Sequence, residues 1–477
     1  MPTSPTGIGA AVAVSLFVLT LSLVHAAEET TATKQRAVAY EFATSSYLGA
    51  AGYDDSVVGA RIQSDGTIVL AANLGADIGQ RIKVEGEARL ALGKNGCIVR
   101  LSADGKKVLS IISVAKEVKD LAIDDQDNLY LAAGGEGLIK TSPKADRVLW
   151  TKTLKNCTRV DAAKDGHFAA LAGGDISIFD PSGAQIGTAN GSNVTNDICI
   201  DGLSRTVIFC GFRNAHAWDG RRNEPVQIGY IFGLSYDGKL KWSDYDWTTD
   251  KGSPRFINKS ENNMADTRAD RCTIGRDGRL YVTFQAAGGN HIFRYGPKNI
   301  MEKATIVGGD KYHRFFNSQA EHKCFFARYD PATGDYLLGQ QFCGRLANNR
   351  ANAVVTANGE ITADEKGRVY LVGNASYGLP LTVNPGGEYS GGGFILVMSP
   401  DLKDRLLCTR TSAGNGAPHA LDAHAIGGRI RAVYGGGGMP KDMFVKDAIE
   451  AVPGDEGAAN KGPKDGFFVV LEEKQTR

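Results

Sequence analysis

Acidic residues recur at one place in the sequence pattern, directly before a short apolar run. They are Asp120 in "VKDLAID", Asp197 in "TNDICID" and Asp270 in "RADRCTIG", with Glu360 and Asp422 in related places further on. Carboxylates that gather at one channel mouth attract cations or a basic side chain, and one of them can acquire a raised pKa. The alternative, which we favour, is structural: each carboxylate accepts hydrogen bonds from backbone N–H groups of the adjoining turn.

Two polar segments carry residues suited to recognition, "GFRNAHAWDGRRNEP" from Gly211 and "GGDKYHRFFNSQAEHK" from Gly308. Arginine and aromatic side chains are enriched at binding hot spots. The alternative is that these side chains pack the loops against the body of the fold. The segments also supply Arg222 and His322, and the candidate ligand-binding residues are Arg213, His216, Trp218, Arg221, Tyr312, His313, Arg314 and Phe315.

Motifs for metal, phosphate or nucleophilic chemistry are missing. The sequence has no glycine-rich phosphate loop, HExxH, CxxC or GxSxG pattern. His291, His313 and His322 share one segment, but their spacing is not one that a helix or strand fixes for metal binding. We therefore expect no metal, no cofactor and no catalytic residue. An enzyme stays open as the alternative, with the mouth carboxylates and His313 or His216 as acid and base.

The elements that position these residues come from a repeat. A short apolar strand, a turn with Asp, Pro or Gly and a second strand occur seven times, starting at Gly96, Gly137, Asp175, Gly229, Cys324, Gly392 and Gly466. Examples are "GCIVRLSADGKKVLSII" and "CFFARYDPATGDYLLGQQF". Each copy reads as a β-hairpin, and another hairpin, such as "VKDLAIDDQDNLYLAA", precedes it. Four strands per unit and a period above about 40 residues predict an all-β, seven-bladed β-propeller of four-stranded blades.

The blade boundaries follow from this repeat, and the last copy is incomplete. "GFFVVLEEKQTR" supplies one strand and the sequence then ends, whereas "AYEFATSS" from Ala39 matches the outer strand that this blade lacks. We expect 37–477 to form a single propeller domain in which 37–46 pairs with the last blade and removes two exposed strand edges. Only Glu87–Leu92 and Lys441–Ala451 look locally helical. The blades are expected at about 55–115, 116–156, 157–190, 194–247, 268–343, 352–411 and 417–473.

Part of this repeat resembles a known family. The run "CFFARYDPATGDYLLGQQFCG", followed by "GEITADEKGRVYLVGN" and "YGLPLTVNPGG", is similar to the bacterial beta-propeller repeats often called SBBP repeats. The segment "SSYLGAAGYDDSVVGARIQSDGTIVLA" resembles the junction between that family's units. The match is good in blades 1, 5, 6 and 7 and loose in blades 2 to 4. The resemblance implies a propeller and export, and it brings no catalytic residue.

The long connections fall at only two kinds of joint. With strands a to d running from the axis outward, every a–b and c–d turn is short, and the long segments are all b–c or d–a connections. Such connections emerge on one face, where long irregular loops are usually functional. We expect a recognition face built from 73–95, 211–227, 243–267, 285–323, 374–391 and 435–465.

The first residues read as a secretory signal. An apolar run at Ile8–Val24 precedes "VHA", so we expect cleavage after Ala26 and a disordered linker at 27–36. The mature chain should have no membrane span and should be secreted, periplasmic or at the cell surface. The alternative is a retained membrane anchor, because the run is long and no Lys or Arg precedes it.

Eight cysteines permit disulfides in an exported chain, and Cys324 and Cys343 flank one turn at nearly mirror positions. A bridge between them is possible only in a suitable strand register, which the sequence does not define. The alternative is buried thiols.

Net charge is +1, which gives no reason to expect nucleic acid as a partner. Together these features predict an exported, non-catalytic binding or scaffold protein that recognises a protein or a polysaccharide. The alternative is a polysaccharide lyase or hydrolase acting at the same face. The ligand itself is not encoded in any motif.

Overall fold

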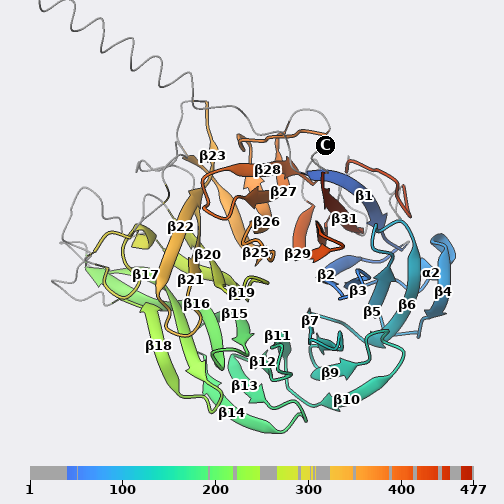
Figure 1. Ribbon diagram of the computed structural model, residues 1–477, viewed down its shortest axis with the longest axis horizontal. Helices are drawn as coiled ribbons and strands as arrows, with labels where there is room; N and C mark the ends of the chain where they lie inside the picture. Colours follow the sequence, from blue (N-terminus) through green and yellow to red (C-terminus); the bar gives the residue numbers. More distant parts are fainter. Residues whose placement is uncertain are drawn as a thin grey trace, which may run out of the picture. The chain divides into compact units, whose positions relative to one another are not determined.

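The protein is built almost entirely from β-strands (Figure 1). The computed structural model describes residues 40–474 except 51, 192–193, 219–222, 248–265, 288–291, 301, 305–306, 308–322, 348–350, 386–388, 412–415, 439–442 and 452–463. The expected signal peptide and linker lie outside the described residues. Helical structure within them is limited to α2 (Ile78–Arg81) and a 3₁₀ turn at Ile292–Arg294, and neither is long enough to cross a membrane.

Five four-stranded antiparallel sheets follow one another along the described chain. The first two contain β7 (Asp120–Ile123), β8 (Leu129–Ala132), β9 (Leu138–Thr141) and β10 (Val148–Lys152), then β11 (Cys157–Ala162), β12 (Phe168–Ala172), β13 (Asp175–Phe179) and β14 (Gln185–Asn190). The next two contain β15 (Val194–Asp201), β16 (Thr206–Trp218), β17 (Asn223–Ser235) and β18 (Leu240–Tyr245), then β19 (Thr267–Ile274), β20 (Leu280–Ala286), β21 (Lys323–Tyr329) and β22 (Tyr336–Phe342). The fifth contains β25 (Val354–Ala363), β26 (Val369–Ser376), β27 (Gly391–Met398) and β28 (Arg405–Arg410).

The first and last parts of the described chain share a larger sheet. One half of it has β2 (Ser56–Ile62), β3 (Ile68–Asn73), β5 (Gly96–Leu101) and β6 (Val108–Ala115), with β4 (Val84–Arg89) pairing parallel to β6 at the outer edge. The other half has β29 (Ala417–Ile426), β30 (Arg429–Gly437), β31 (Gly466–Glu473) and β1 (Tyr40–Leu48). A single pair, Ser56 with Gly437, joins the halves. A small separate ladder pairs β23 (Gly344–Arg345) with β24 (Ala351–Asn352).

These sheets lie around a central axis as the blades of a β-propeller (Figure 1). The first strand of each four-strand group is innermost, and each inner strand contacts the next, in the order β2, β7, β11, β15, β19, β25 and β29. β29 in turn contacts β2. The inner strands therefore bring residues from widely separated parts of the sequence to one axis.

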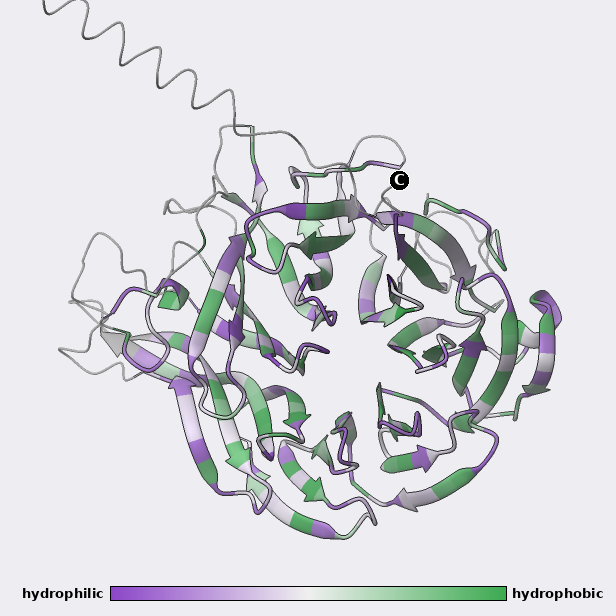
Figure 2. Cartoon of the chain, viewed as in Figure 1, coloured by the Kyte–Doolittle hydropathy of each residue, from purple (hydrophilic) through white to green (hydrophobic). Residues whose placement is uncertain are grey.

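The hydrophobic core is divided among the spaces between neighbouring sheets. Leu121 and Leu131 of one sheet, for example, pack with Ile98 and Ile112 of the preceding one. The second strand of a sheet is covered on both sides, so β3 and β20 are buried along their whole length. Outer strands such as β14 face solvent and alternate polar with apolar residues, as the colouring of Figure 2 shows. This arrangement explains why the strands of the repeat differ in hydrophobicity.

The first described strand pairs with the last. β1 runs antiparallel to β31 from Tyr40 opposite Glu473 to Leu48 opposite Gly466, with one bulge between Phe42 and Thr44. β31 also pairs with β30, so β1 occupies the outer position of a four-strand group.

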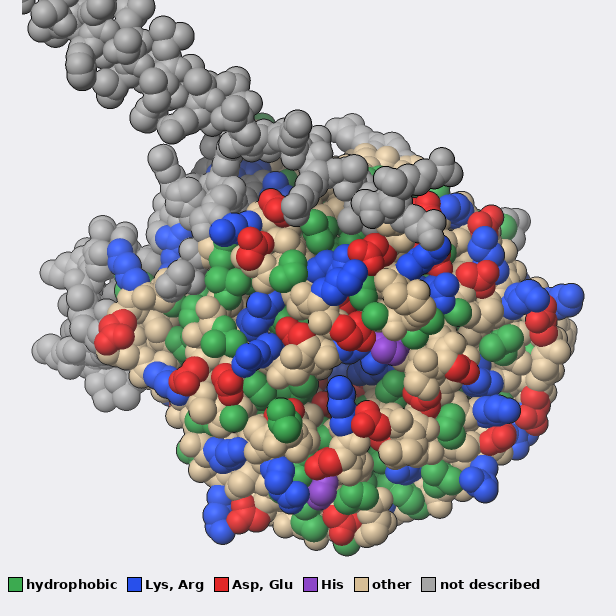
Figure 3. Space-filling model, in the orientation of Figure 1, with side chains coloured by type: hydrophobic (Ala, Val, Ile, Leu, Met, Phe, Trp, Pro, Cys, Tyr) green, Lys and Arg blue, Asp and Glu red, His purple; other side chains and the backbone are tan. Residues whose placement is uncertain are grey.

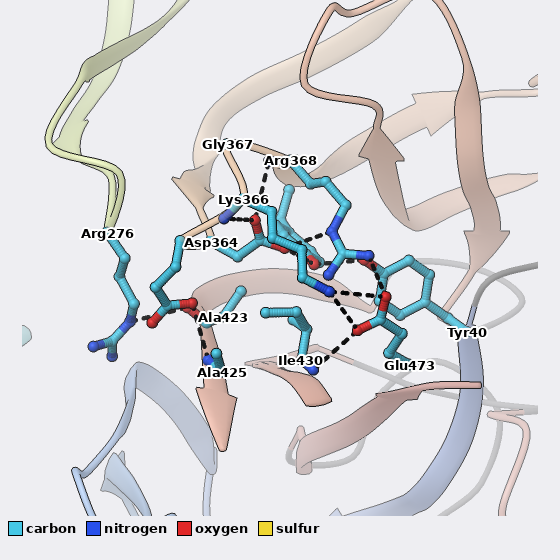
Figure 4. A network of polar contacts seen from close by, with 12 residues as sticks. Tyr40, Arg276, Asp364, Lys366, Gly367, Arg368, Ala423, Ala425, Ile430 and Glu473 are labelled. Atoms are coloured by element: carbon cyan, nitrogen blue, oxygen red, sulfur yellow. Dashed lines mark hydrogen bonds and ion pairs between the residues drawn. The ribbon is translucent and has the colours of Figure 1, made fainter. Parts of the chain in front are cut away.

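A polar network that runs from the buried Asp364 to the exposed Lys366 fastens this strand pair to the neighbouring sheet (Figure 4). Glu473 accepts a hydrogen bond of 2.7 Å from Arg368 and one of 3.3 Å from Lys366. Arg368 also donates to Asp364 at 2.7 Å. The Tyr40 hydroxyl lies 2.6 Å from that of Tyr370, which donates to Asp364. We call this group the β1–β31 clasp network.

Three sequence expectations about local structure were wrong. Residues Glu87–Arg89 are strand, because β4 pairs with the open edge of β6, which outweighs their helical preference. The described residues 443–451 form no helix, and Lys446 instead bridges Ser45. Residues 211–227 are not a loop for most of their length, because β16 and β17 continue through them as a ladder.

Candidate functional site

Acidic and basic residues alternate around the axis on five successive inner strands. Asp120 on β7, Arg159 on β11, Arg271 on β19 and Glu360 on β25 each lie three residues before the end of their strand, and Asp197 on β15 lies four before. A register shift in the pairing of the inner strand with the second strand of its sheet directly precedes Arg159, Asp197, Arg271 and Glu360. Such bulges change the direction of a side chain. The order acid, arginine, acid, arginine, acid thus follows the ring.

Most of these carboxylates link one blade to the next. Asp120 accepts a hydrogen bond from the backbone N–H of Val160 at 3.0 Å, and Asp197 accepts one from that of Cys272 at 3.0 Å. Two further carboxylates repeat this contact: Asp161 accepts from Ile200 N–H at 2.9 Å and Asp422 from Ile62 N–H at 2.8 Å. The donor is on the next inner strand in every case, so these acids link neighbouring blades. The sequence led us to expect donors in the acid's own turn, and these four bonds come from the adjacent strand instead.

Asp270 is placed differently from the other mouth carboxylates. It is 1% exposed. One carboxylate oxygen accepts a hydrogen bond of 3.0 Å from the Thr356 hydroxyl, and the other has no hydrogen-bond partner among the residues that the structure describes. Burial raises the pKa of Asp270 to about 6, with the Arg271 charge acting in the opposite direction. Asp270 therefore joins the β19 and β25 strands rather than the ring of alternating charges.

Arginines occupy the spaces between these acids. Arg159 lies 3.5 Å from Asp197 through its Nε atom, and Arg271 donates to the carbonyls of Gly359 at 2.9 Å and Asp270 at 3.1 Å. Arg61 on β2 donates to its neighbour's carbonyl at 2.8 Å. Arg276 reaches from the turn after β19 and pairs with Asp422 at 2.8 Å. Figure 3 shows the face above the axis hollowed at its centre, with basic and acidic side chains gathered around the hollow.

The electrostatics differ among the acids. Burial, reinforced by the charge of Asp197, raises the pKa of Glu360 to about 8, although three arginines act against it. Burial also raises the pKa of Asp161 to about 7. Asp422 is buried as well, yet Arg276, Arg61 and the Ile62 N–H hold its pKa below the usual range. Glu360 therefore holds a proton at neutral pH more readily than Asp161 or Asp422 does, and burial raises the pKa of Asp197 as well.

The recognition residues of the first polar segment lie on the long β16–β17 hairpin. Arg213 pairs with Asp246 and donates to the Trp247 carbonyl at 2.7 Å, so it anchors the hairpin, and His216 is exposed. Trp218 ends β16, and its side chain is not among those described. The remaining predicted residues lie outside the described residues: Arg221, Arg222, Tyr312, His313, Arg314 and Phe315.

The expected Cys324–Cys343 bridge is not formed in the structure. The β21–β22 register places Cys324 opposite Phe342, and all eight cysteines are buried thiols. Within the described ranges, no three His, Cys, Asp or Glu side chains are placed to hold a metal ion. His291, His313 and His322 lie outside these ranges.

Sequence reasoning missed the basic half of the axial site. It named Asp120, Asp197 and Glu360 but not Arg159 or Arg271, which occupy the corresponding position on the intervening strands. If the residues of each blade had been numbered backwards from its a–b turn, all five positions would have aligned, because the turn fixes the register of the hairpin.

Comparisons with known proteins identify no family for this chain. No protein-family model matches the chain, and no curated protein matches it. Solved structures with similar folds include U3-55K at 9% identity, covering 91% of this chain and 99% of that chain with a TM-score of 0.48. The WD40 propeller domain of Doa1 has 9% identity, 92% and 98% coverage and a TM-score of 0.46. Kuenenia stuttgartiensis hydrazine synthase has 10% identity, 79% and 92% coverage and a TM-score of 0.42.

Proposed function

We propose that this chain is an exported, non-catalytic binding scaffold: a seven-bladed propeller, closed by β1 on β31, that recognises a protein through its long-loop face. The ring of contacts among the inner strands and the β1–β31 ladder support seven blades and closure. The apolar leader and the resemblance to bacterial beta-propeller repeats support export to the periplasm or the cell surface.

The observation that carries the binding function is a two-stranded arm. β16 and β17 pair continuously from Thr206 with Ser235 to Trp218 with Asn223. Their sheet neighbours stop earlier, because β15 reaches only Phe212 and β18 only Tyr230. Residues 213–218 and 223–228, here called the arm, therefore extend beyond the four-stranded sheet.

The arm is built to be held in place and to present side chains. Arg213 fixes its base to Asp246 and Trp247, whereas Asn214, His216 and Pro225 are exposed further out. A two-stranded ribbon alone is marginally stable in water. An anchored ribbon with exposed polar and ring-bearing residues suits a protein-binding surface.

The described geometry gives less support to an enzyme. General acid–base catalysis needs two groups that converge on one substrate position. Asp120, Asp161, Asp197 and Asp422 are each engaged by a backbone donor, and the alternative of a polysaccharide lyase or hydrolase is left with Glu360 as its acid.

Site-specific cross-linking tests the proposal. A photo-reactive residue at position 216 should capture one protein from an extract of the native host, whereas one at Leu203, which is 96% exposed on a different turn, should not. In a pull-down of the captured protein, a variant with 216–225 replaced by a two-residue turn should no longer bind. Its urea unfolding midpoint should be unchanged, because the buried Val226 and the hydrogen bonds of Gln227 are kept.

Equal capture from both positions, or binding by the shortened variant, would contradict the role of the arm. If the intact protein binds a glycan array and the shortened variant does not, the ligand of the arm is a polysaccharide and not a protein. Glycan cleavage that depends on Glu360 would replace it with the enzyme.

A further inference from the structure

Three guanidinium groups converge near one carboxyl group at the axis. Arg271 donates to the carbonyl of Gly359, the residue before Glu360, and both Arg271 and Arg159 reach the Asn196 carbonyl, at 3.4 and 3.5 Å. The charges of these two arginines and of Arg61 act on Glu360, and the four residues come from four different inner strands. Glu360 itself accepts one hydrogen bond, of 3.2 Å, from the N–H of Ile361. We call Arg61, Arg159, Arg271 and Glu360 the axial arginine cluster.

The arginines keep unused donors. Arg159 contacts Asp197 and the Asn196 carbonyl through Nε alone, each at 3.5 Å, so its two terminal nitrogens donate to no acceptor among the described residues. Arg271 uses Nε and one terminal nitrogen, and Arg61 one terminal nitrogen, for bonds to backbone carbonyls. A guanidinium group has five N–H donors in a fork that matches a carboxylate or phosphate.

The neighbouring acids do not use up these donors. Asp120, Asp161 and Asp197 direct one oxygen each to a backbone N–H of the next inner strand, and Asp422 is paired with Arg276. Figure 3 shows the face above the axis hollowed at its centre, which gives a ligand a way in along the axis.

We propose that the axial arginine cluster binds a small oxyanion, a carboxylate or a phosphate group, in the central channel. Arg159 and Arg271 hold the anion by charge-assisted hydrogen bonds from their unused nitrogens, and Arg61 adds a third positive charge. Glu360, when protonated, donates its O–H to the same anion.

The charges at the axis make this binding dependent on pH. With every group ionised, the acids outnumber the arginines, so an anion is repelled until Asp161 or Glu360 takes up a proton. The pKa values of these two lie at about 7 and 8, so affinity falls as pH rises through this window. The charged and titratable groups that interact electrostatically with the axial arginine cluster include Asp120, Asp161, Asp197, Asp270, His419 and Asp422.

Titration calorimetry with inorganic phosphate and, separately, with citrate tests the proposal on the intact chain. We expect binding of at least one anion at pH 6 that weakens about tenfold or more by pH 8.5. Arg159→Gln should weaken it about tenfold or more, because a charge-assisted hydrogen bond is lost. Arg89→Gln, at a half-exposed position on β4, is the control and should bind as wild type does.

Tighter binding of phosphate would show that the natural ligand carries a phosphate group, and tighter binding of citrate would show that it carries a carboxylate. If Arg159→Gln fails to fold, Glu360→Gln serves instead, and it should strengthen binding at pH 8.5 and flatten the pH dependence. No binding of either anion, or equal binding by wild type and both axial variants, would overturn the proposal.

Discussion

Removing the negative charge of Glu473 should loosen the β1–β31 clasp network. Arg368 is 6% exposed, and it is balanced by Asp364 and Glu473, each with an oxygen 2.7 Å away. Hydrogen bonding to Arg368 is the main cause that lowers the pKa of Glu473 to about 2 from its usual 4.5. That difference corresponds to about 3 kcal/mol of stability at neutral pH, or about 1.5 kcal/mol after allowance for solvent screening.

Glu473→Gln should therefore lower the free energy of unfolding by about 1.5 kcal/mol at pH 7, as measured by urea unfolding. The stabilisation is fully present above pH 4.5 and is lost as pH falls towards 2, so wild type and variant should converge in acid. Glu41→Gln is the matched control, because Glu41 is exposed on the same strand pair. An equal effect from both variants, or a Glu473 effect that persists at pH 2, would refute the reasoning.

Three further substitutions test other parts of the fold by urea unfolding. Asp197→Asn should cost about 1–3 kcal/mol, because it weakens the bond to the Cys272 N–H and leaves buried arginines less balanced; no loss would contradict the inter-blade role. Asp244→Asn should stabilise the protein at pH 8, since neither oxygen of this buried carboxyl group has a hydrogen-bond partner in the described part of the chain and burial raises its pKa to about 8. Wild type therefore loses stability as pH rises from 4 to 8, and parallel pH profiles of wild type and variant would contradict this. Gly233→Ala should cost about 1–3 kcal/mol, because its Cβ would lie 2.2 Å from the Trp242 ring, and an unchanged midpoint would show that the ring can shift.

The propeller class could be predicted from sequence because the repeat is local. Each hairpin carries its own turn residues and alternation, so strands such as Gly96–Leu101 and Cys324–Tyr329 were placed without tertiary information. β4 and the arm were missed for a different reason. The pairing of β4 with β6 and the continuation of β16 past Gly211 depend on neighbouring strands, which local preference does not encode.

The axial site could be predicted only in part. Asp120, Asp197 and Asp270 share an obvious motif, but Asp270 lies one residue off the alternating ring because a register shift between Ala269 and Arg271 turns the next side chain to the corresponding position. The donors to these carboxylates belong to the adjacent inner strand, so they follow from the packing of blades rather than from any one repeat. The hydrogen-bond partners of these carboxylates therefore could not be predicted from the sequence.

The closure of the ring by β1 and β31 is tested most directly by hydrogen exchange. In the intact chain, the amides of β31 should exchange as slowly as those of the buried β20, since β31 is paired on both sides. Deleting Ala37–Ser46 should make them exchange at least about a hundredfold faster and cause the protein to aggregate through the exposed edge. A deleted variant that stays monomeric, with the amides of β31 still protected, would contradict the account.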